Sequence, residues 1–238
     1  MPSSDVSTPP RCLIARIAFA LLPLCLAGSA SAQMAISVTA ESDYRFRGVS
    51  LSDEKPSLHL SLGYDGASGW YGGATAATVE LEPDRRIAQL LGYAGYAARA
   101  ASGLGWELGA TQAHFDGSSR YDYGEFYGGL NGQGWNARLY YSPSYFGRGV
   151  RTAYAELNGG WPQEGLLRLF AHVGALLPLG SSQGSPRNRY DLRLGVSAAL
   201  VRSGEVQLAW VAASRGGPYP AIYEQKRGAL VLSASLFF

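Results

Sequence analysis

The segment Ile-Ser-Val-Thr-Ala-Glu-Ser-Asp-Tyr-Arg-Phe-Arg-Gly, residues 36–48, alternates between two kinds of side chain along its whole length. Its even positions are uncharged, whereas its odd positions carry four charges, at Glu41, Asp43, Arg45 and Arg47. Because successive side chains of a β-strand point to opposite faces, this spacing predicts one uncharged face and one charged face. At about 3.3 Å per residue, the segment is long enough to cross a bilayer at a tilt. We therefore predict that it is the first strand of a transmembrane β-barrel.

Residues 1–32 have the organisation of a secretory signal peptide. Two arginines precede an apolar run at 17–27, and Ala30-Ser31-Ala32 has the small residues of a cleavage site. We expect export, cleavage after Ala32 and a mature chain of residues 33–238. Both cysteines lie in the leader, at Cys12 and Cys25, so the mature chain would have no thiol for a disulfide, a metal or nucleophilic catalysis. Acylation of Cys25 is a weaker alternative, because bulky Leu24 precedes it.

The composition also agrees with an exported barrel. The chain has 31 glycines in 238 residues, and 20 Lys+Arg against 18 Asp+Glu leave a formal net charge of only +2. This balance gives no indication of nucleic-acid binding. Beyond the leader, no apolar run approaches the roughly 18 residues of a membrane helix. Ordinary hydropathy with many Gly and Tyr residues is typical of membrane β-barrels, whose strands give weak hydropathy signals.

Eleven further segments are predicted to be strands, most of them with a clear two-residue alternation. Asn131-Gly132 between two alternating runs is a strong hairpin signal. The segment 86–99 is ambiguous, because Gln89 and Arg99 place the polar face at odd positions where Ile87 and Leu91 also lie. The eleven segments are 56–65, 70–81, 86–99, 104–114, 121–130, 135–142, 152–161, 167–177, 189–200, 206–212 and 227–238.

Twelve strands in a meander predict an all-β fold, namely a transmembrane up-and-down antiparallel β-barrel. The breaks alternate between short Gly-containing turns and longer polar loops, as in bacterial outer-membrane barrels with periplasmic turns and external loops. Both termini then fall on the turn side, and the first strand must pair with 227–238 to close the barrel. A soluble β-sandwich is the alternative, but the apolar stripe recurs on terminal strands and no long crossover interrupts the meander.

The last strand has apolar residues at alternate positions up to Leu236 and the terminal Phe238. This pattern resembles the assembly signal of outer-membrane barrels. We therefore expect the barrel assembly machinery to recognise it, and outer-membrane lipid to contact the barrel surface. The sequence does not indicate an oligomeric state.

The charged residues at lumen-facing parity are candidates for solute selectivity. They are Glu41, Asp43, Arg45, Arg47, Glu125, Arg138, Glu156, Arg168, Arg189, Asp191 and Arg193. One interpretation is a set of salt bridges that stiffens the barrel. The other is a constriction in which arginines, Arg45 and Arg47 in particular, attract anionic solutes. Twelve strands leave a lumen about 10 Å wide where the side chains are short, which admits only ions and small metabolites. No loop is long enough to form a large folded plug, although one could fold inward.

The motif Ser42-Asp43-Tyr44-Arg45-Phe46-Arg47-Gly48, followed by Asp53 and Pro56, resembles the opening motif of the TorF-like porins, a conserved family of Gram-negative outer-membrane proteins. The motif residues are Ser42, Asp43, Tyr44, Phe46, Arg47 and Gly48. The runs 126–130 and 139–147 also resemble that family. The resemblance implies an outer-membrane barrel with a porin role, no catalytic residue and no defined solute.

We therefore predict a passive outer-membrane channel for small hydrophilic solutes, with no cofactor and no enzymatic activity. The first alternative is a non-conducting structural or surface-binding barrel whose lumen is closed by salt bridges. The second is a barrel-embedded hydrolase, for which the sole candidate pair is outward-facing His114 with Ser118 or Ser119. Three histidines without Cys or a close His–His spacing also argue against a metal site.

Overall fold

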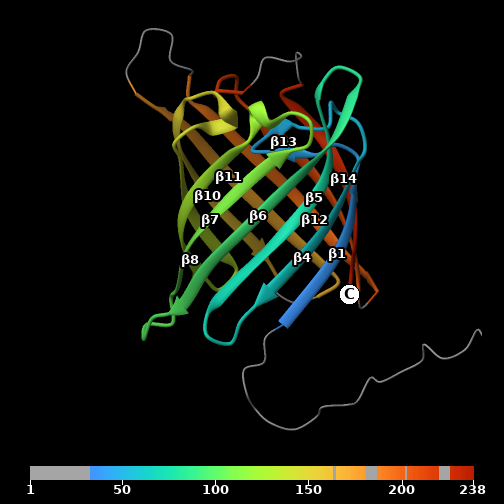
Figure 1. Cartoon of the computed structure of the whole chain (residues 1–238). Helices are drawn as coiled ribbons and strands as arrows, with labels where there is room; N and C mark the ends of the chain where they lie inside the picture. Colours follow the sequence, from blue (N-terminus) through green and yellow to red (C-terminus); the bar gives the residue numbers. More distant parts are fainter. Residues whose placement is uncertain (1–32, 163–164, 181–186, 202, 220–225) are drawn as a thin grey trace, which may run out of the picture. The chain divides into compact units, whose positions relative to one another are not determined.

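The computed structural model describes residues 33–162, 165–180, 187–201, 203–219 and 226–238. Twelve antiparallel strands form a closed barrel (Figure 1), which confirms the predicted fold class. The strands of the barrel are β1 (Gln33–Glu41), β4 (Ser57–Asp65), β5 (Trp70–Glu82), β6 (Arg85–Arg99), β7 (Gly105–Phe115), β8 (Tyr123–Gly132), β9 (Trp135–Ser142), β10 (Arg151–Trp161), β11 (Leu167–Leu179), β12 (Arg189–Val201), β13 (Gly204–Ala213) and β14 (Gly228–Phe237). In the described part of the chain, no helix is long and apolar enough to span a membrane.

The barrel is closed by pairing between its first and last strands. Val38 lies opposite Leu236 of β14, and on the other side of β1 it lies opposite Leu60 of β4. Phe238 extends the closure, because its backbone N–H donates to the carbonyl of Ile36 at 2.9 Å. The predicted pairing of the two terminal segments is therefore confirmed, and each strand of the barrel has two neighbours.

The outer surface of the barrel is apolar, as the alternation predicts. Leu58 and Leu60 are each 54 % exposed and Phe126 is 65 % exposed, so large hydrophobic side chains point away from the interior. Leu236 and Phe238 at the carboxyl end are likewise exposed on this surface. In water such a surface would be unfavourable, whereas a bilayer solvates it.

The two ends of the barrel differ in their connections. At the turn end, short turns connect β4–β5, β6–β7, β8–β9 and β12–β13, and Phe238 lies at the same end (Figure 1). At the loop end lie the longer connections, including the short 3-10 helices η1 (Ser119–Tyr121) and η2 (Tyr145–Gly147). Exposed tryptophans gather near the turn end, at positions 70, 106, 135 and 161, where aromatic residues would meet a membrane interface.

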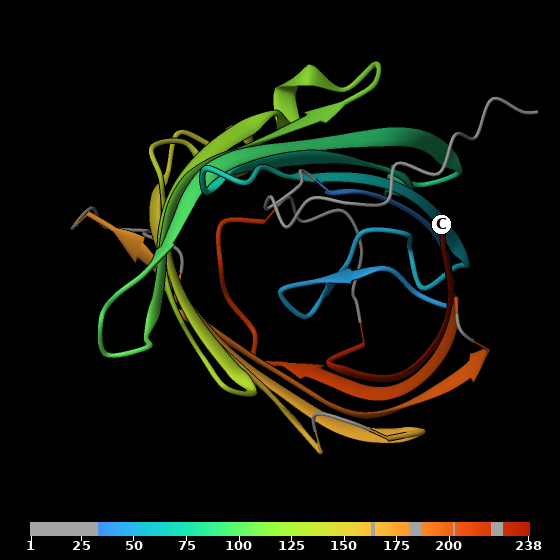
Figure 2. The same ribbon diagram turned by 90° about the horizontal axis from the view of Figure 1, so that it is seen from below.

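The prediction for residues 36–48 is wrong in its second half. The strand β1 begins earlier, at Gln33, and ends at Glu41. Residues 42–56, here called the inner segment, leave the wall and form a small hairpin of β2 (Arg45–Phe46) and β3 (Val49–Ser50). Figure 2 shows this hairpin inside the ring of strands. Tyr44 and Phe46 consequently pack inside the barrel and not against lipid.

Local chemistry explains why the strand stops there. Asp43 accepts hydrogen bonds from the Nε of Arg45 at 2.6 Å and from the hydroxyl of Ser50 at 2.6 Å. Such side-chain bonds compete with a strand ladder and favour a turn. Arg47 and Gly48 both have positive φ, 51° and 71°, as a tight two-residue hairpin requires. In the sequence, Gly48 is the residue that indicates this turn, but Arg-Gly is a much weaker hairpin signal than Asn-Gly.

The interior at the loop end is an apolar core. Val49 and Leu51 of the inner segment pack there with buried residues from the wall, from η1 and from η2, namely Val79, Leu81, Ala113, Phe115, Tyr121, Tyr123, Tyr145, Phe146, Tyr154 and Leu176. These residues form the loop-end core. It resolves the ambiguity of 86–99, because odd positions do face inward and Ile87 and Leu91 pack against this core. The apolar odd face of 70–81, with Val79 and Leu81, also points inward and not to lipid.

Candidate functional site

A buried ion pair joins the inner segment to the far wall of the barrel. Arg47 donates to both carboxylate oxygens of Glu125, at 2.8 and 2.7 Å. Glu125 belongs to β8, which lies five strands from β1 around the ring, so the pair crosses the interior. The two side chains are only 5 % and 3 % exposed. A bidentate geometry of this kind is the strong form of a charge-assisted hydrogen bond.

Aromatic rings enclose the Arg47 guanidinium. Its carbon lies 3.9 Å from the centroid of Tyr154 and 5.3 Å from that of Tyr145. Burial raises the pKa of Tyr219 to about 12, so this residue stays a phenol and shares a 3.0 Å hydrogen bond with the Tyr145 hydroxyl. The charge of Arg47 is therefore matched by Glu125 and by cation–π contacts, and it is shielded from solvent.

Further contacts connect the inner segment to the surrounding structure. Arg45 donates to the backbone oxygen of Lys226 at 3.0 Å, and the Lys226 ammonium lies 2.7 Å from Glu54. On another side, Lys55 donates to Glu80 of β5 at 2.5 Å. The Tyr44 hydroxyl donates to Gln89 of β6 at 3.1 Å. The inner segment is thus bonded to the β13–β14 connection and to two wall strands.

Polar networks line the middle of the lumen on both sides. On one side, Arg138 donates to Glu107 at 2.7 Å, and the Tyr71 hydroxyl donates to the same carboxylate at 2.7 Å. On the other, His172 is 2.8 Å from Asp191 through Nε2 and 2.6 Å from Asn158 through Nδ1. These contacts satisfy charges that would otherwise be desolvated without partners.

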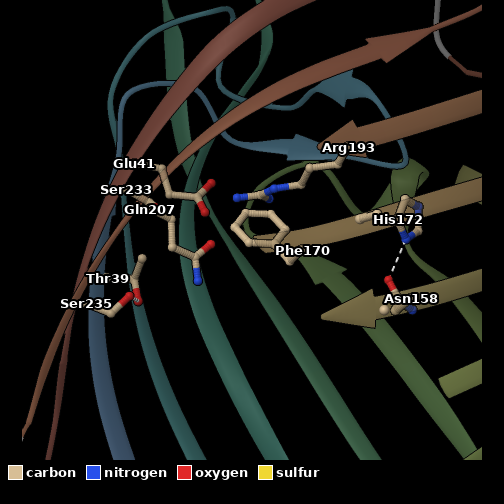
Figure 3. Close-up of a pocket in the computed structure, with 11 residues that line it drawn as sticks. Thr39, Glu41, Asn158, Phe170, His172, Arg193, Gln207, Ser233 and Ser235 are labelled. Carbon is tan, nitrogen blue, oxygen red and sulfur yellow. Dashed lines mark hydrogen bonds between the residues drawn. The ribbon is translucent and has the colours of Figure 1, made fainter. Parts of the chain in front are cut away.

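The lumen near the turn end is open and polar. One cavity, of about 460 Å³, is lined by Thr39, Glu41, Asn158, Gly159, Phe170, Ala171, His172, Arg193, Gln207, Ser233 and Ser235. We call it the turn-end cavity (Figure 3). A second cavity, of about 390 Å³, shares Asn158, Gly159 and Phe170 with it and also contacts Arg168. The turn-end half of the lumen therefore contains solvent-accessible polar space.

The charged residues predicted for the lumen all lie in the interior, but in two different settings. Asp43, Arg45 and Arg47 belong to the inner segment, so the predicted ladder of charges along one strand is wrong. Arg189 donates to the carbonyls of Gly48 and Gly216, each at 3.3 Å, and thereby supports the inner hairpin. The other charged residues predicted for the lumen belong to strands of the barrel wall, namely Glu41, Glu125, Arg138, Glu156, Arg168, Arg189, Asp191 and Arg193.

Several interior residues did not stand out in the sequence. Phe170 and Gln207 line the turn-end cavity, and Glu205 accepts a 2.7 Å hydrogen bond from Gln207. Their strand parity was the available signal, because each stands at an inward position of β11 or β13. Parity alone could not distinguish them from residues that merely fill space.

The geometry does not bring together the pair needed for a hydrolase. His114 faces outward as predicted, but its Nδ1 contacts Asp122 at 2.6 Å. The Ser118 hydroxyl instead accepts a hydrogen bond from Arg85 at 3.1 Å. Within the described residues, no hydrogen bond joins His114 to either serine, and no group of three or more His, Cys, Asp or Glu is placed to hold a metal ion.

Residues 27–235 match a family described as "Bacterial protein of unknown function (Gcw_chp)". The chain belongs to the Gcw_chp family. No curated protein matches it significantly. The match covers almost the whole predicted mature chain, so the barrel and its inner segment both lie within the family region.

Two solved structures of a porin have a similar fold. The KdgM porin matches with a TM-score of 0.55 and 12 % identity, over 86 % of this chain and 99 % of that chain. The KdgM porin in complex with disordered oligogalacturonate matches with a TM-score of 0.52 and 11 % identity, over the same shares of the two chains. At these identities the likeness concerns the fold alone, a closed antiparallel β-barrel similar to that of these porins.

Proposed function

We propose that this protein is an outer-membrane channel for small hydrophilic solutes, with the inner segment as its constriction. Solutes would pass through the polar turn-end lumen, and the inner segment would limit passage at the loop end. The charges offered to a solute would be Glu41, Arg168 and Arg193. The arginines that the sequence favoured for this role, Arg45 and Arg47, are engaged by Asp43 and Glu125.

The observation that carries the proposal is the unfilled polar lumen at the turn end. At the loop end, side chains fill the interior and form a packed core that stabilises the barrel. At the turn end the chain instead leaves cavities of about 460 and 390 Å³ beside charged side chains. Polar water-accessible interiors are the feature by which porins conduct.

Location and orientation follow from the same proposal. The apolar outer face would contact outer-membrane lipid, the turn end would face the periplasm and the loop end the exterior. The leader, residues 1–32, lies outside the described residues, and its cleavage after Ala32 stays a prediction. Recognition of Leu236 and Phe238 by the assembly machinery also stays a prediction. Membership in the TorF-like porins stays a prediction too, and it would imply the same porin function.

Single-channel conductance in planar bilayers tests the proposal. The purified wild-type protein should give small current steps, and replacing residues 43–55 by a short Gly-Ser link should increase their size. The link would join Ser42 to Pro56 without the inner hairpin. If neither protein conducts, although both show the heat-modifiable gel migration of a folded barrel, the channel proposal is wrong.

A non-conducting barrel is the second candidate, and one observation favours it. The loop-end core includes residues from β5, β7, β8, β10 and β11 together with Val49 and Leu51 of the inner segment, so apolar packing extends across the interior. In that case the wild-type protein would be silent and only the variant without residues 43–55 would conduct. The barrel would then act as a structural or surface-binding protein.

A further inference from the structure

Two opposite charges in the turn-end cavity have no hydrogen-bond partner. Among the described residues the Glu41 side chain has no hydrogen bond, and the basic group within 4.0 Å of its carboxylate is the His59 imidazole, which is charged only when protonated. The buried Nε of Arg193 likewise has no partner. Both residues line the cavity of about 460 Å³. In Figure 3 the carboxylate of Glu41 and the guanidinium of Arg193 point toward one another across this space.

Three other pairs of interior charges in the described part of the chain are matched at shorter distances. Arg47 pairs with Glu125 at 2.7 Å, Arg138 with Glu107 at 2.7 Å, and His172 with Asp191 at 2.8 Å. Pairing is the usual way in which a protein offsets the desolvation of buried charge. Glu41 and Arg193 depart from this pattern, although they are close enough in space to share one cavity.

Much of the rest of the cavity wall is hydrogen-bonded or apolar. Thr39 and Ser235 share a 2.8 Å hydrogen bond, and the Gln207 amide donates to Glu205 at 2.7 Å. The ring of Phe170 lies beside the Arg193 guanidinium, 5.7 Å from its carbon to the ring centroid. The wall therefore offers one anion, one cation and an apolar surface between them.

We propose that the turn-end cavity binds a small zwitterion of the α-amino-acid class. The ligand ammonium would lie against Glu41 and its carboxylate would accept hydrogen bonds from Arg193, whose planar guanidinium suits a carboxylate. A lone anion would satisfy Arg193 but face Glu41, and a lone cation would do the reverse. The cavity volume lies within the range of about 300–1,000 Å³ typical of small-molecule sites. Phe170 provides an apolar contact for the ligand's side chain.

This inference rests on the proposed channel in that it names the class of solute, but its test needs no transport. L-alanine is titrated into the folded protein in detergent by isothermal titration calorimetry, beside three analogues of similar size. These are L-alaninamide with only the ammonium, L-lactate with only the carboxylate, and propanamide with neither charge. L-alanine should bind at least tenfold more tightly than each analogue. Equal binding of an analogue, or no binding of L-alanine, overturns the inference.

Three conservative variants locate the site. Glu41→Gln and Arg193→Gln should each weaken L-alanine binding about 10- to 100-fold, the range expected for loss of one charge-assisted contact. Arg99→Gln is the matched control, because Arg99 ends β6 at the turn end and lines neither of the two cavities, and it should leave binding within threefold of wild type. Unchanged binding in Glu41→Gln or Arg193→Gln, with a folded barrel, overturns the assignment.

The failure of this inference can be told apart from the failure of the channel. Conductance without L-alanine binding would overturn the zwitterion site and leave the channel standing. Binding without conductance would support the site and make it a periplasm-facing pocket in a closed barrel.

Discussion

The loop-end and turn-end halves of this barrel are built on the same twelve strands but differ in what fills them. At the loop end, the inner segment and the loop-end core occupy the interior, and Phe115 and Tyr145 are fully buried. At the turn end, the interior contains cavities bordered by Glu41, Arg168 and Arg193. The strand pattern makes a closed wall in both halves, whereas the side chains and one inward-folded segment decide whether the interior is closed. Four measurements test this difference between the two halves.

Removing one phenylalanine from each half should produce the largest difference. Phe115→Ala should lower the free energy of unfolding by about 3–5 kcal/mol, because it leaves a cavity in a packed core. Phe170 is only partly buried and borders open space, so Phe170→Ala should cost about 2 kcal/mol or less. Urea titration of the barrel in lipid vesicles measures both values. Equal losses would mean that the two halves are packed alike.

Breaking the buried ion pair should have a comparable effect at the loop end. Arg47→Leu leaves Glu125 buried without its cation, and the expected loss is about 3–5 kcal/mol in the same titration. The double variant Arg47→Leu/Glu125→Leu removes the stranded charge and should recover most of this loss. A double variant as unstable as the single one would show that the ring contacts, and not the ion pair, stabilise the inner segment.

Adding one methyl group at a glycine should give a smaller, graded difference. Gly48 has a φ of +71°, and a Cβ there would lie 2.6 Å from the Cβ of Ala213. Gly103, in a turn at the other end, has a φ of +87° but no atom within 4 Å of its would-be Cβ. Gly48→Ala should therefore cost about 2–3 kcal/mol, and Gly103→Ala about 1 kcal/mol from the left-handed backbone alone. Equal costs would mean that the inner hairpin yields easily at its contact with β13.

The smallest effect concerns Glu54 and its dependence on pH. Partial burial favours the neutral form of Glu54, but the hydrogen bonds from Lys226 outweigh it and lower the pKa below its ordinary value of 4.5. A lowered pKa in the folded state means that the stabilisation is present above 4.5 and is lost as the pH falls through the lowered value. Glu54→Gln should therefore cost less than about 1 kcal/mol at pH 7, since the pair is largely solvated.

The same urea titration at low pH completes this test. Below the pKa of Glu54 in the folded state, wild type and Glu54→Gln should be equally stable. Lys226→Gln should match Glu54→Gln at pH 7, and the double variant should lose little more. A difference that persists in acid would assign the effect to the shape of the Glu54 side chain and not to its charge.

Much of the wall could be predicted from the sequence, because its signals are local. Alternation over ten or so residues identified the strands, and β9 (Trp135–Ser142) has the predicted bounds. The pairing of the first strand with the last also followed, because an unpaired edge inside a membrane would leave backbone groups unsatisfied. The alternation in 70–81 does not determine which face is lipid-facing, because an apolar face can meet either lipid or an apolar core, and the alternation is the same for both.

The candidate site was predictable only in part. Parity correctly turned Glu41, Arg168 and Arg193 toward the lumen, but it could not tell which charges would find partners. Arg193 stays without a hydrogen bond at Nε because Glu41 stands three strands away around the ring. Arg47 is fully paired because the inner segment carries it to β8. Whether two charged side chains form an ion pair depends on the distance between them across the lumen. The alternation of residues along each strand does not determine that distance.

The sequence alone specifies a twelve-stranded barrel with an apolar exterior and a charged interior, because these features follow from alternation and turn residues. Only the tertiary structure decided that residues 42–56 leave the wall and fill the loop end. The reason is that their course depends on Arg47 meeting Glu125, 78 residues further along the chain, and on Val49 and Leu51 finding an apolar core. The strand conformation of residues 36–41 follows from their local alternation. The conformation of the residues just after them depends on contacts that exist only when the barrel has closed.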